Sequence, residues 1–392
     1  MKKNIYLFFV LLVLGIGSFA QTNKLIVNKG ISLLDDSLQS IRMMKSLNVF
    51  LENAYQDNFE RSMIPTSEIT ETKVLVDELR GITKPGRIGD SIPFIGYLLN
   101  VVELDSGVIA ITIGYSGIKD NQVVTRAIVD LCAKEKKDSF YFYSPIKERT
   151  KGWKHQTIGY TTFHYKSTFD EANAKTFLNY KDAFDKKLKV TPIPIQFYIC
   201  DDYKEACYLS GISYKMDLNG YGHSVNSATE NNSYVIVDGT NTESTYDPHD
   251  LWHARLRKAI SKDSINRPVD EGCAYLYGGS WGITWPEIKY MFKENVINNQ
   301  DNNWLKLYEA FYNFNPNKSK SLNVPYFINA LIIQKIEKEK GFAGVLTMVS
   351  CGKYKKDNEQ YFKTLEMLTG INRENFNTRV DELVNAEFRG QK

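Results

Sequence analysis

The amino-acid sequence predicts an α+β fold in which a β-rich segment is followed by a mostly helical half. Between Pro93 and Ser167 the chain carries short β-branched and aromatic runs, which are typical of antiparallel strands. From residue 247 onward, apolar residues recur at helical spacing in one run after another. With 43% hydrophobic residues in a chain of 392, the composition can fill two or three domain cores.

The first twenty residues have the order of an export signal. Lys2 and Lys3 precede the apolar run IYLFFVLLVLGIG, and small residues end at Ala20. The run is shorter than the roughly 20 apolar residues that a transmembrane helix needs, and no cysteine follows to accept a lipid. We therefore expect cleavage after Ala20 (residues 1–20 being the signal peptide), no transmembrane anchor in the mature chain, and a periplasmic or secreted protein.

The net charge gives no indication of a nucleic-acid partner. The formal charge is +3, and removal of Lys2 and Lys3 lowers it to +1, because 49 basic residues become 47 against 46 acidic ones. A nucleic-acid-binding domain usually carries a strong basic excess. We therefore expect no nucleic-acid binding.

Residues 21–92 form a helical lead-in by periodicity, and residues 93–168 a β-rich domain. The last strand expected in that domain is QTIGYTTFHYK. Thr168 and Glu171 then have the spacing of a capping box before the helical run EANAKTFLNYKDAFDKKL. We place the domain boundary there, so that residues 169–392 make up the second domain.

The second domain begins with mixed elements and becomes helical. The strands IPIQFYIC and SYVIVDG are expected first, and the helical runs begin after them. Beyond residue 280, helices are expected to begin near Thr284, Asp301, Pro325, Asp357 and Asn372.

All five cysteines lie in the expected mature chain, so an odd number is available for pairing. In an oxidising compartment Cys200 could pair with Cys207 if the strand and the segment after it turn back on each other. Two buried thiols are the alternative. The sequence leaves both open.

Two of the five histidines stand one helical turn apart in the stretch DPHDLWHARL. His249 and His253 are at positions i and i+4, so on a helix both imidazoles can point from one face at one ion. Asp247 followed by Pro248 predicts the helix start, because aspartate is a favoured N-cap and proline a favoured first residue. The stretch reads H-D-x-x-H, with Asp250 where the zinc-peptidase pattern H-E-x-x-H has glutamate.

A catalytic zinc ion needs a third protein ligand and one position open to water. Glu271, in the stretch PVDEGCAYLYGG, is the nearest suitable residue after His253. Two histidines at this spacing with a glutamate nearby also occur by chance on exposed helices. The order of the three residues, with helical pattern around each, favours a metal site over that alternative.

His249, His253 and the downstream Glu271-Gly272-x-Ala274 resemble the gluzincins, which are thermolysin-like and aminopeptidase-like metallopeptidases with a glutamate on a second helix as third ligand. The helical tail that contains FINALIIQKIEKEKGFAGVLTMV is similar to that of bacterial peptidase-MA-like proteins. The resemblance covers residues 169–392. It implies a gluzincin-like catalytic domain, a Zn²⁺ ion on His249, His253 and Glu271, and a peptide or protein substrate.

Asp250 is the departure from that pattern. The family's glutamate accepts a proton from zinc-bound water as it attacks the carbonyl. Aspartate has the same chemistry but is shorter by about 1.5 Å, one C–C bond. Asp250 also falls at the third position of the expected helix, where a carboxylate stabilises the helix dipole and capping amides. We assign it the role of catalytic base, with the capping role as the alternative.

Several other residues are candidates for secondary roles. An electrophile for the oxyanion could come from Tyr275, Tyr277, Tyr246 or His223, although a chain with 24 tyrosines offers candidates everywhere. Trp252 is expected to face the core. Arg255 could pair with a carboxylate such as Asp270, or be solvated.

The sequence therefore supports an exported zinc metallopeptidase that hydrolyses peptide bonds with metal-activated water. A catalytically impaired binding protein of the cell envelope with the same fold is the alternative, and the shorter base favours it. A structural or envelope-assembly protein is a third class, which leaves the three ligand residues unexplained.

Overall fold

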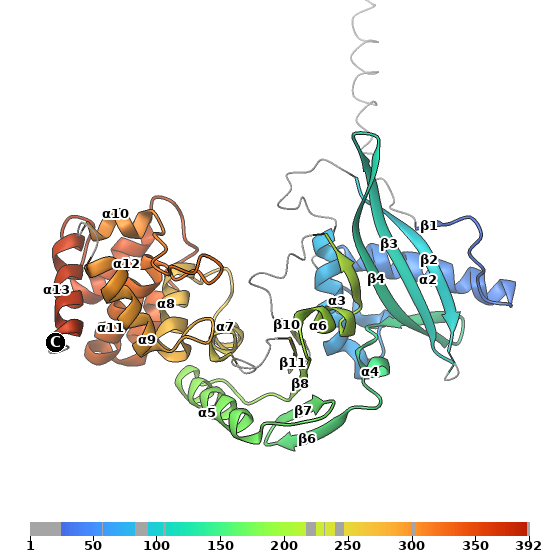
Figure 1. Cartoon of the computed structure of the whole chain (residues 1–392), viewed down its shortest axis with the longest axis horizontal. Helices are drawn as coiled ribbons and strands as arrows, with labels where there is room; N and C mark the ends of the chain where they lie inside the picture. The colour runs from blue at the N-terminus through green and yellow to red at the C-terminus, as the bar shows by residue number, and fades with distance from the viewer. Residues whose placement is uncertain are drawn as a thin grey trace, which may run out of the picture. The chain divides into compact units, whose positions relative to one another are not determined.

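The structure is a computed structural model of the whole chain, and the residues that it describes are 25–56, 58–82, 93–104, 107–216, 225–230, 232–239, 247–298 and 303–389. The expected export signal lies outside these residues. The chain forms two compact units, Met1–Lys147 with Ser210–Leu218, and Glu148–Leu209 with Asn219–Lys392 (Figure 1). No helix among the described residues is both long and apolar enough to span a membrane.

The first unit is built on a six-stranded sheet in the order β1-β2-β3-β4-β5, with β9 also paired to β4. Only the β1–β2 pair is parallel. The strands are β1 (Ile26–Val27), β2 (Ile95–Glu103), β3 (Ile109–Lys119), β4 (Gln122–Lys136), β5 (Ser139–Tyr143) and β9 (Ile212–Lys215). Asp120 and Asn121 join β3 to β4 with φ of 49° and 61°, and such a two-residue turn matches the twist of paired strands.

Two helices of the lead-in belong to this same unit. They are α2 (Ser37–Ala54) and α3 (Ile69–Ile82), separated by the short helices η1 (Arg61–Met63) and η2 (Thr66–Glu68). Asp36 caps α2 by accepting hydrogen bonds from the first-turn amides. Phe50 of α2 packs against Phe142 of β5, with ring centroids 5.3 Å apart. The lead-in is therefore packed into the core of the β-rich unit.

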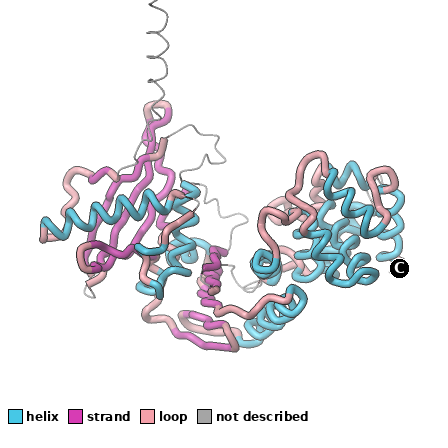
Figure 2. Tube along the Cα trace, turned by 180° about the vertical axis from the view of Figure 1, so that it is seen from behind, coloured by secondary structure: helices cyan, strands magenta, loops and turns pink. Residues whose placement is uncertain are grey.

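The second unit begins with a five-stranded sheet in the order β10-β11-β8-β7-β6. Figure 2 draws the strands in magenta and the helices in cyan. The central strands β7, β8 and β11 are parallel, whereas the edge strands β6 and β10 are antiparallel to their neighbours. The strands are β6 (Lys154–Ile158), β7 (Thr161–Tyr165), β8 (Ile195–Ile199), β10 (Val225–Glu230) and β11 (Ser233–Asp238). Between them in sequence lie α5 (Glu171–Leu188) and α6 (Tyr203–Leu209), while α4 (Ile146–Arg149) precedes β6.

The predicted boundary near Thr168 differs from the division that the structure has at Lys147. The segment expected as the last strand of the β-rich domain forms β7 and part of β6, and β7 pairs in parallel with β8 of the second sheet. Strand periodicity identifies a strand but not its partner, so this assignment was wrong. The predicted cap of α5 was also wrong, because Asp170 accepts the capping hydrogen bond from the Asn173 amide.

The rest of the second unit is helical, as the periodicity predicts. The helices are α7 (Pro248–Ala259), α8 (Arg267–Gly278), α9 (Trp285–Phe292), the π-helical η3 (Lys293–Ile297), α10 (Trp304–Glu309), α11 (Val324–Val349), α12 (Glu359–Thr369) and α13 (Phe376–Phe388). The first part of α11 is buried on every side, which is typical of a central helix. Gly272 lets α8 approach it, since a Cβ there would lie 2.7 Å from the Cβ of Asn329. The mixed sheets and the helical second half confirm the α+β class.

Candidate metal centre

The first two turns of α7 present His249 and His253 on one face. Asp247 is the N-cap and accepts a hydrogen bond of 2.9 Å from the backbone N–H of His249, and Pro248 occupies the first helical position. This confirms the predicted helix start. The two imidazoles lie one turn apart with ring centroids at 4.7 Å and Nε2 atoms at 3.1 Å.

Glu271 reaches the same point from α8. Its Oε2 atom lies 3.4 Å from Nε2 of His249 and 3.9 Å from Nε2 of His253. One ligand atom from each of the three residues lies within 4.8 Å of the others, so the group could hold a metal ion. The side chains retain only 11–15% of their exposure, and they leave one side of the group open to a cavity.

Each histidine is oriented by a contact at its other ring nitrogen. Nδ1 of His249 lies 2.8 Å from the carbonyl oxygen of Gly279. Nδ1 of His253 lies 2.9 Å from Oδ2 of Asp270 but forms no hydrogen bond in this geometry, so the contact is electrostatic. A proton held at each Nδ1 leaves both Nε2 lone pairs for a cation, as in many metal sites. Asp270 is itself held by Trp252, whose Nε1 donates a hydrogen bond of 3.0 Å.

The charges of the group favour a bound cation. Burial opposes the charged form of His249, but its hydrogen bond to Glu271 and the charge of Asp247 outweigh this and raise its pKa to about 9. Burial opposes the charged form of Glu271 as well, yet the two histidines lower its pKa to about 2. A negative carboxylate facing two imidazoles is a donor set that fits a divalent ion.

Asp250 lies in the first turn of α7, next to His249, and its side chain is exposed. The capping bond comes from Asp247, and the reciprocal bond of a capping box is not formed. No hydrogen bond joins Asp250 to another part of the chain that the structure describes. Its capping role is therefore limited to the helix dipole, and its role as base stays a prediction.

Of the four candidate electrophiles, the two that the structure describes have hydroxyl groups that already form hydrogen bonds. The hydroxyl of Tyr277 donates to Glu337 at 2.6 Å, and that of Tyr275 accepts from the Asn323 amide at 3.2 Å. His223 and Tyr246 lie outside the described residues. Tyr326, which the sequence analysis did not consider, lines the cavity beside Glu271, and burial raises its pKa to about 12. No local pattern marks it, because it reaches the site from α11 through tertiary packing.

Arg255 occupies neither of its predicted environments. It is only 1% exposed and is paired with Asp185 of α5, while its Nη2 donates to the Thr191 carbonyl at 3.1 Å. Trp252, three residues before Arg255 on α7, is fully buried as predicted. Together they fix α7 between α5 and α8, so the ligand face cannot rotate away.

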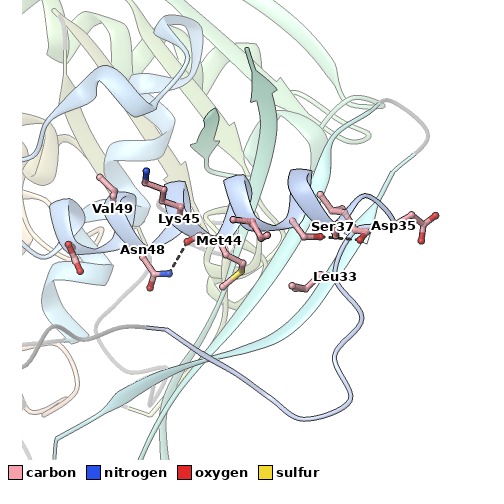
Figure 3. Close-up of a pocket in the computed structure, with 11 residues that line it drawn as sticks. Leu33, Asp35, Ser37, Met44, Lys45, Asn48 and Val49 are labelled. Atoms are coloured by element: carbon pink, nitrogen blue, oxygen red, sulfur yellow. Dashed lines mark hydrogen bonds between the residues drawn. The ribbon is translucent and has the colours of Figure 1, made fainter. Parts of the chain in front are cut away.

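A cavity of about 820 Å³ opens beside two of the three ligand residues, His253 and Glu271. Its walls come from α7, α8, the loop between them, and the segments around Phe311, Tyr326 and Tyr354. A different hollow of about 790 Å³ runs along α2 in the first unit, where Figure 3 draws Leu33, Met44 and Val49 among its lining residues. That hollow is mainly apolar and contains no histidine or cysteine.

All five cysteines are buried thiols, so the structure favours the second of the two alternatives for Cys200 and Cys207.

Comparison with models of known protein families finds no match to the chain, and comparison with curated proteins finds no significant match. The geometry of the site is therefore the basis for assigning a function to the protein.

Proposed function

We propose that the protein is a gluzincin-like zinc metallopeptidase that acts on peptide or protein substrates outside the cytoplasm. The observation that carries the proposal is the convergence of His249, His253 and Glu271, each with a ligand atom within 4.8 Å of the others. Two imidazole nitrogens and one carboxylate form a ligand set typical of catalytic zinc sites. The expected export signal supports the location.

A zinc ion at this site supplies a Lewis acid that acidifies water and polarises a carbonyl. Hydrolysis joins the water oxygen to the carbonyl carbon, breaks the C–N bond and transfers a proton to the departing amine. Asp250 is the residue proposed to accept that proton and to deliver it. Its exposure and its freedom from hydrogen bonds with the described residues leave the carboxylate available for this work.

The contacts of the neighbouring residues define what the chain itself contributes. Asp270 and the Gly279 carbonyl hold the imidazoles so that both Nε2 atoms face Glu271. Tyr326 lies at the cavity wall beside Glu271 and is the best candidate among the described residues to donate a hydrogen bond to a substrate oxygen.

A binding protein without catalysis is the alternative, and the length of Asp250 favours it. The side chain is about 1.5 Å shorter than glutamate, while a general base must approach its proton donor to within about 3 Å. The ligand residues would then bind a metal ion for structure or recognition only.

The experiment that tests the proposal measures zinc content and peptide hydrolysis of the purified mature protein. We expect about one zinc per chain, lost in His249→Ala and retained in His155→Ala, which removes an exposed histidine of β6. We expect Asp250→Asn to keep the metal and to lower the hydrolysis rate by about 100-fold or more. Absence of zinc in the wild type would refute the metal site.

Zinc binding without hydrolysis of a broad peptide library would favour the binding protein. In that case Asp250→Glu is informative, because the longer side chain restores the reach of the family's base. Hydrolysis at a rate unchanged by Asp250→Asn would show that another residue is the base.

A further inference from the structure

The cavity beside the ligand residues is strongly basic. Four of its lining residues are cationic, namely Arg257, Lys262, Arg267 and Lys353. Its two acidic lining residues, Asp270 and Glu271, are both engaged with the histidines of the metal centre. The charge that the cavity offers to a ligand is therefore positive.

Two of these cations lie on the same helix faces as the metal ligands, as their spacing in the sequence shows. Arg257 follows His253 by four residues on α7, so it lies one turn further along the ligand face. Arg267 precedes Glu271 by four residues on α8, and its Nε lies 3.5 Å from Oε1 of Glu271. Each ligand helix thus carries an arginine on the face that holds its metal ligand.

Two of the cations form no ion pair within hydrogen-bonding range in the parts of the chain that the structure describes, although Lys262 lies near enough to Asp263 to interact with its charge. Lys353 forms an ion pair with Asp263, and Arg267 with Glu271. Arg257 and Lys262 form no ion pair or hydrogen bond with a described residue, although both are exposed and line the cavity. An anion entering the cavity would meet these two side chains without displacing an existing partner.

Part of the cavity wall is aromatic, namely Phe311, Tyr326 and Tyr354. The ring of Phe311 packs edge-on against Tyr326 at 6.0 Å and against Tyr354 at 5.4 Å. Such a wall fits the apolar stem of a side chain or a peptide backbone, while the cations fit a charged end. A carboxylate is the charged group that peptides supply, and arginine binds it with paired hydrogen bonds.

We propose that this cavity is the specificity pocket of the peptidase and that Arg257 and Lys262 bind a substrate carboxylate there. The carboxylate comes from an acidic residue next to the scissile peptide bond or from the C-terminus of the peptide. This inference rests on the proposed function, because it assigns the substrate class of the same site.

The test compares peptide binding and cleavage in the full mature protein. Three alanine-based peptides carrying a neutral fluorophore are used. The first has an internal glutamate and an amidated C-terminus, and the second, neutral peptide has glutamine in place of the glutamate and the same amidated C-terminus. The third has glutamine and a free C-terminus. Binding is measured by fluorescence anisotropy after the metal is removed with a chelator, and kcat/KM is measured with zinc present. The test variant is a double substitution, Arg257→Gln combined with Lys262→Gln. The control is Lys258→Gln, which removes an exposed charge of α7 outside the cavity.

We expect the wild type to bind one of the carboxylate peptides about tenfold more tightly than the neutral peptide, and the double variant to lose this preference. Preference for the internal glutamate assigns the pocket to an acidic side chain, and preference for the free end assigns it to the C-terminus. The zinc content and the preference of Lys258→Gln should match the wild type.

Equal affinity of the wild type for all three peptides would overturn the inference, as would an equal loss of preference in Lys258→Gln. Failure of the proposed function has a different result. Cleavage without a carboxylate preference refutes the pocket and keeps the peptidase, whereas a carboxylate preference that depends on Arg257 and Lys262 without any cleavage keeps the pocket and refutes the peptidase.

Discussion

The carboxylate of Asp270 lies beside Nδ1 of His253, while Nε2 of the same imidazole faces Glu271 in the metal centre. Asp270 accepts from Trp252 with one oxygen and lies 2.9 Å from Nδ1 of His253 with the other. From the sequence, Arg255 was one candidate partner of Asp270 and a solvated Arg255 was the alternative, because two residues separated by a loop can meet in several ways. Only the packing of α7 on α8 decides between these pairings.

Replacement of Asp270 by asparagine should weaken metal binding by about 10- to 100-fold. The amide can donate to Nδ1, which moves the imidazole proton to Nε2 and removes a ligand lone pair. Metal affinity measured by competition with a chelator checks this, with Asp201→Asn as control because its carboxylate is exposed and, among the described residues, forms an ion pair with Lys166 alone. An unchanged affinity would show that Asp270 does not orient His253.

The pairing of His249 with Glu271 predicts how the stability of the metal-free protein depends on pH. The pKa of His249 is raised from 6.5 to about 9, so its contribution is complete below pH 6.5 and is lost as the pH rises through 9. The pKa of Glu271 is lowered from 4.5 to about 2, so its contribution is complete above pH 4.5 and is lost as the pH falls through 2. With chelator present, the free energy of unfolding in urea should decrease between pH 6.5 and 9.

That decrease should become smaller in Glu271→Gln, because the neutral amide no longer raises the pKa of His249. An equally steep decrease in this variant would assign the pH dependence to other groups.

At the scale of elements, the metal centre depends on how closely α8 approaches the start of α7. Gly278, at the end of α8, lies against the backbone of Pro248, and a Cβ there would be 2.8 Å from the Pro248 carbonyl carbon. Periodicity predicted both helices, and the Asp247-Pro248 pair predicted where α7 begins. Periodicity could not predict the distance and angle at which α7 and α8 cross, because the sizes of the side chains at the contact decide them.

Gly278→Ala should therefore push the first turn of α7 away and lower both stability and metal affinity. Overpacking of this kind typically costs about 1–3 kcal/mol. Urea unfolding and metal competition measure the two effects. Gly81→Ala is the matched control, since a Cβ at Gly81 of α3 meets no atom within 4 Å and should leave metal binding unchanged. Equal metal affinity in both variants would show that the contact at Gly278 is adaptable.

At the scale of the whole molecule, the second unit includes β6 and β7, which precede the predicted boundary. β7 is hydrogen-bonded to β8 in parallel, and this pairing holds one side of the second sheet. Deletion of β7 would remove Phe163 from the core and expose the backbone edge of β8.

A fragment that begins at residue 148 should therefore unfold cooperatively, whereas one that begins at residue 169 should aggregate or remain unfolded. Circular dichroism and size-exclusion chromatography of the two fragments test this, with the full mature chain as reference. Equal behaviour of the two fragments would show that β6 and β7 are dispensable for the second unit.

The sequence alone determined the α+β class, the helical second half, the start of α7 at Asp247 and Pro248, and the choice of His249, His253 and Glu271 as a ligand set. These follow from local rules, since periodicity, capping and the i, i+4 spacing act within a few residues. Tertiary structure alone decided which sheet receives β7, that Arg255 pairs with Asp185, that Asp270 holds His253, and that Arg257 and Lys262 share a cavity with the metal ligands. Most of these contacts join residues of different elements, and the packing of whole elements, which no local pattern encodes, brings them together.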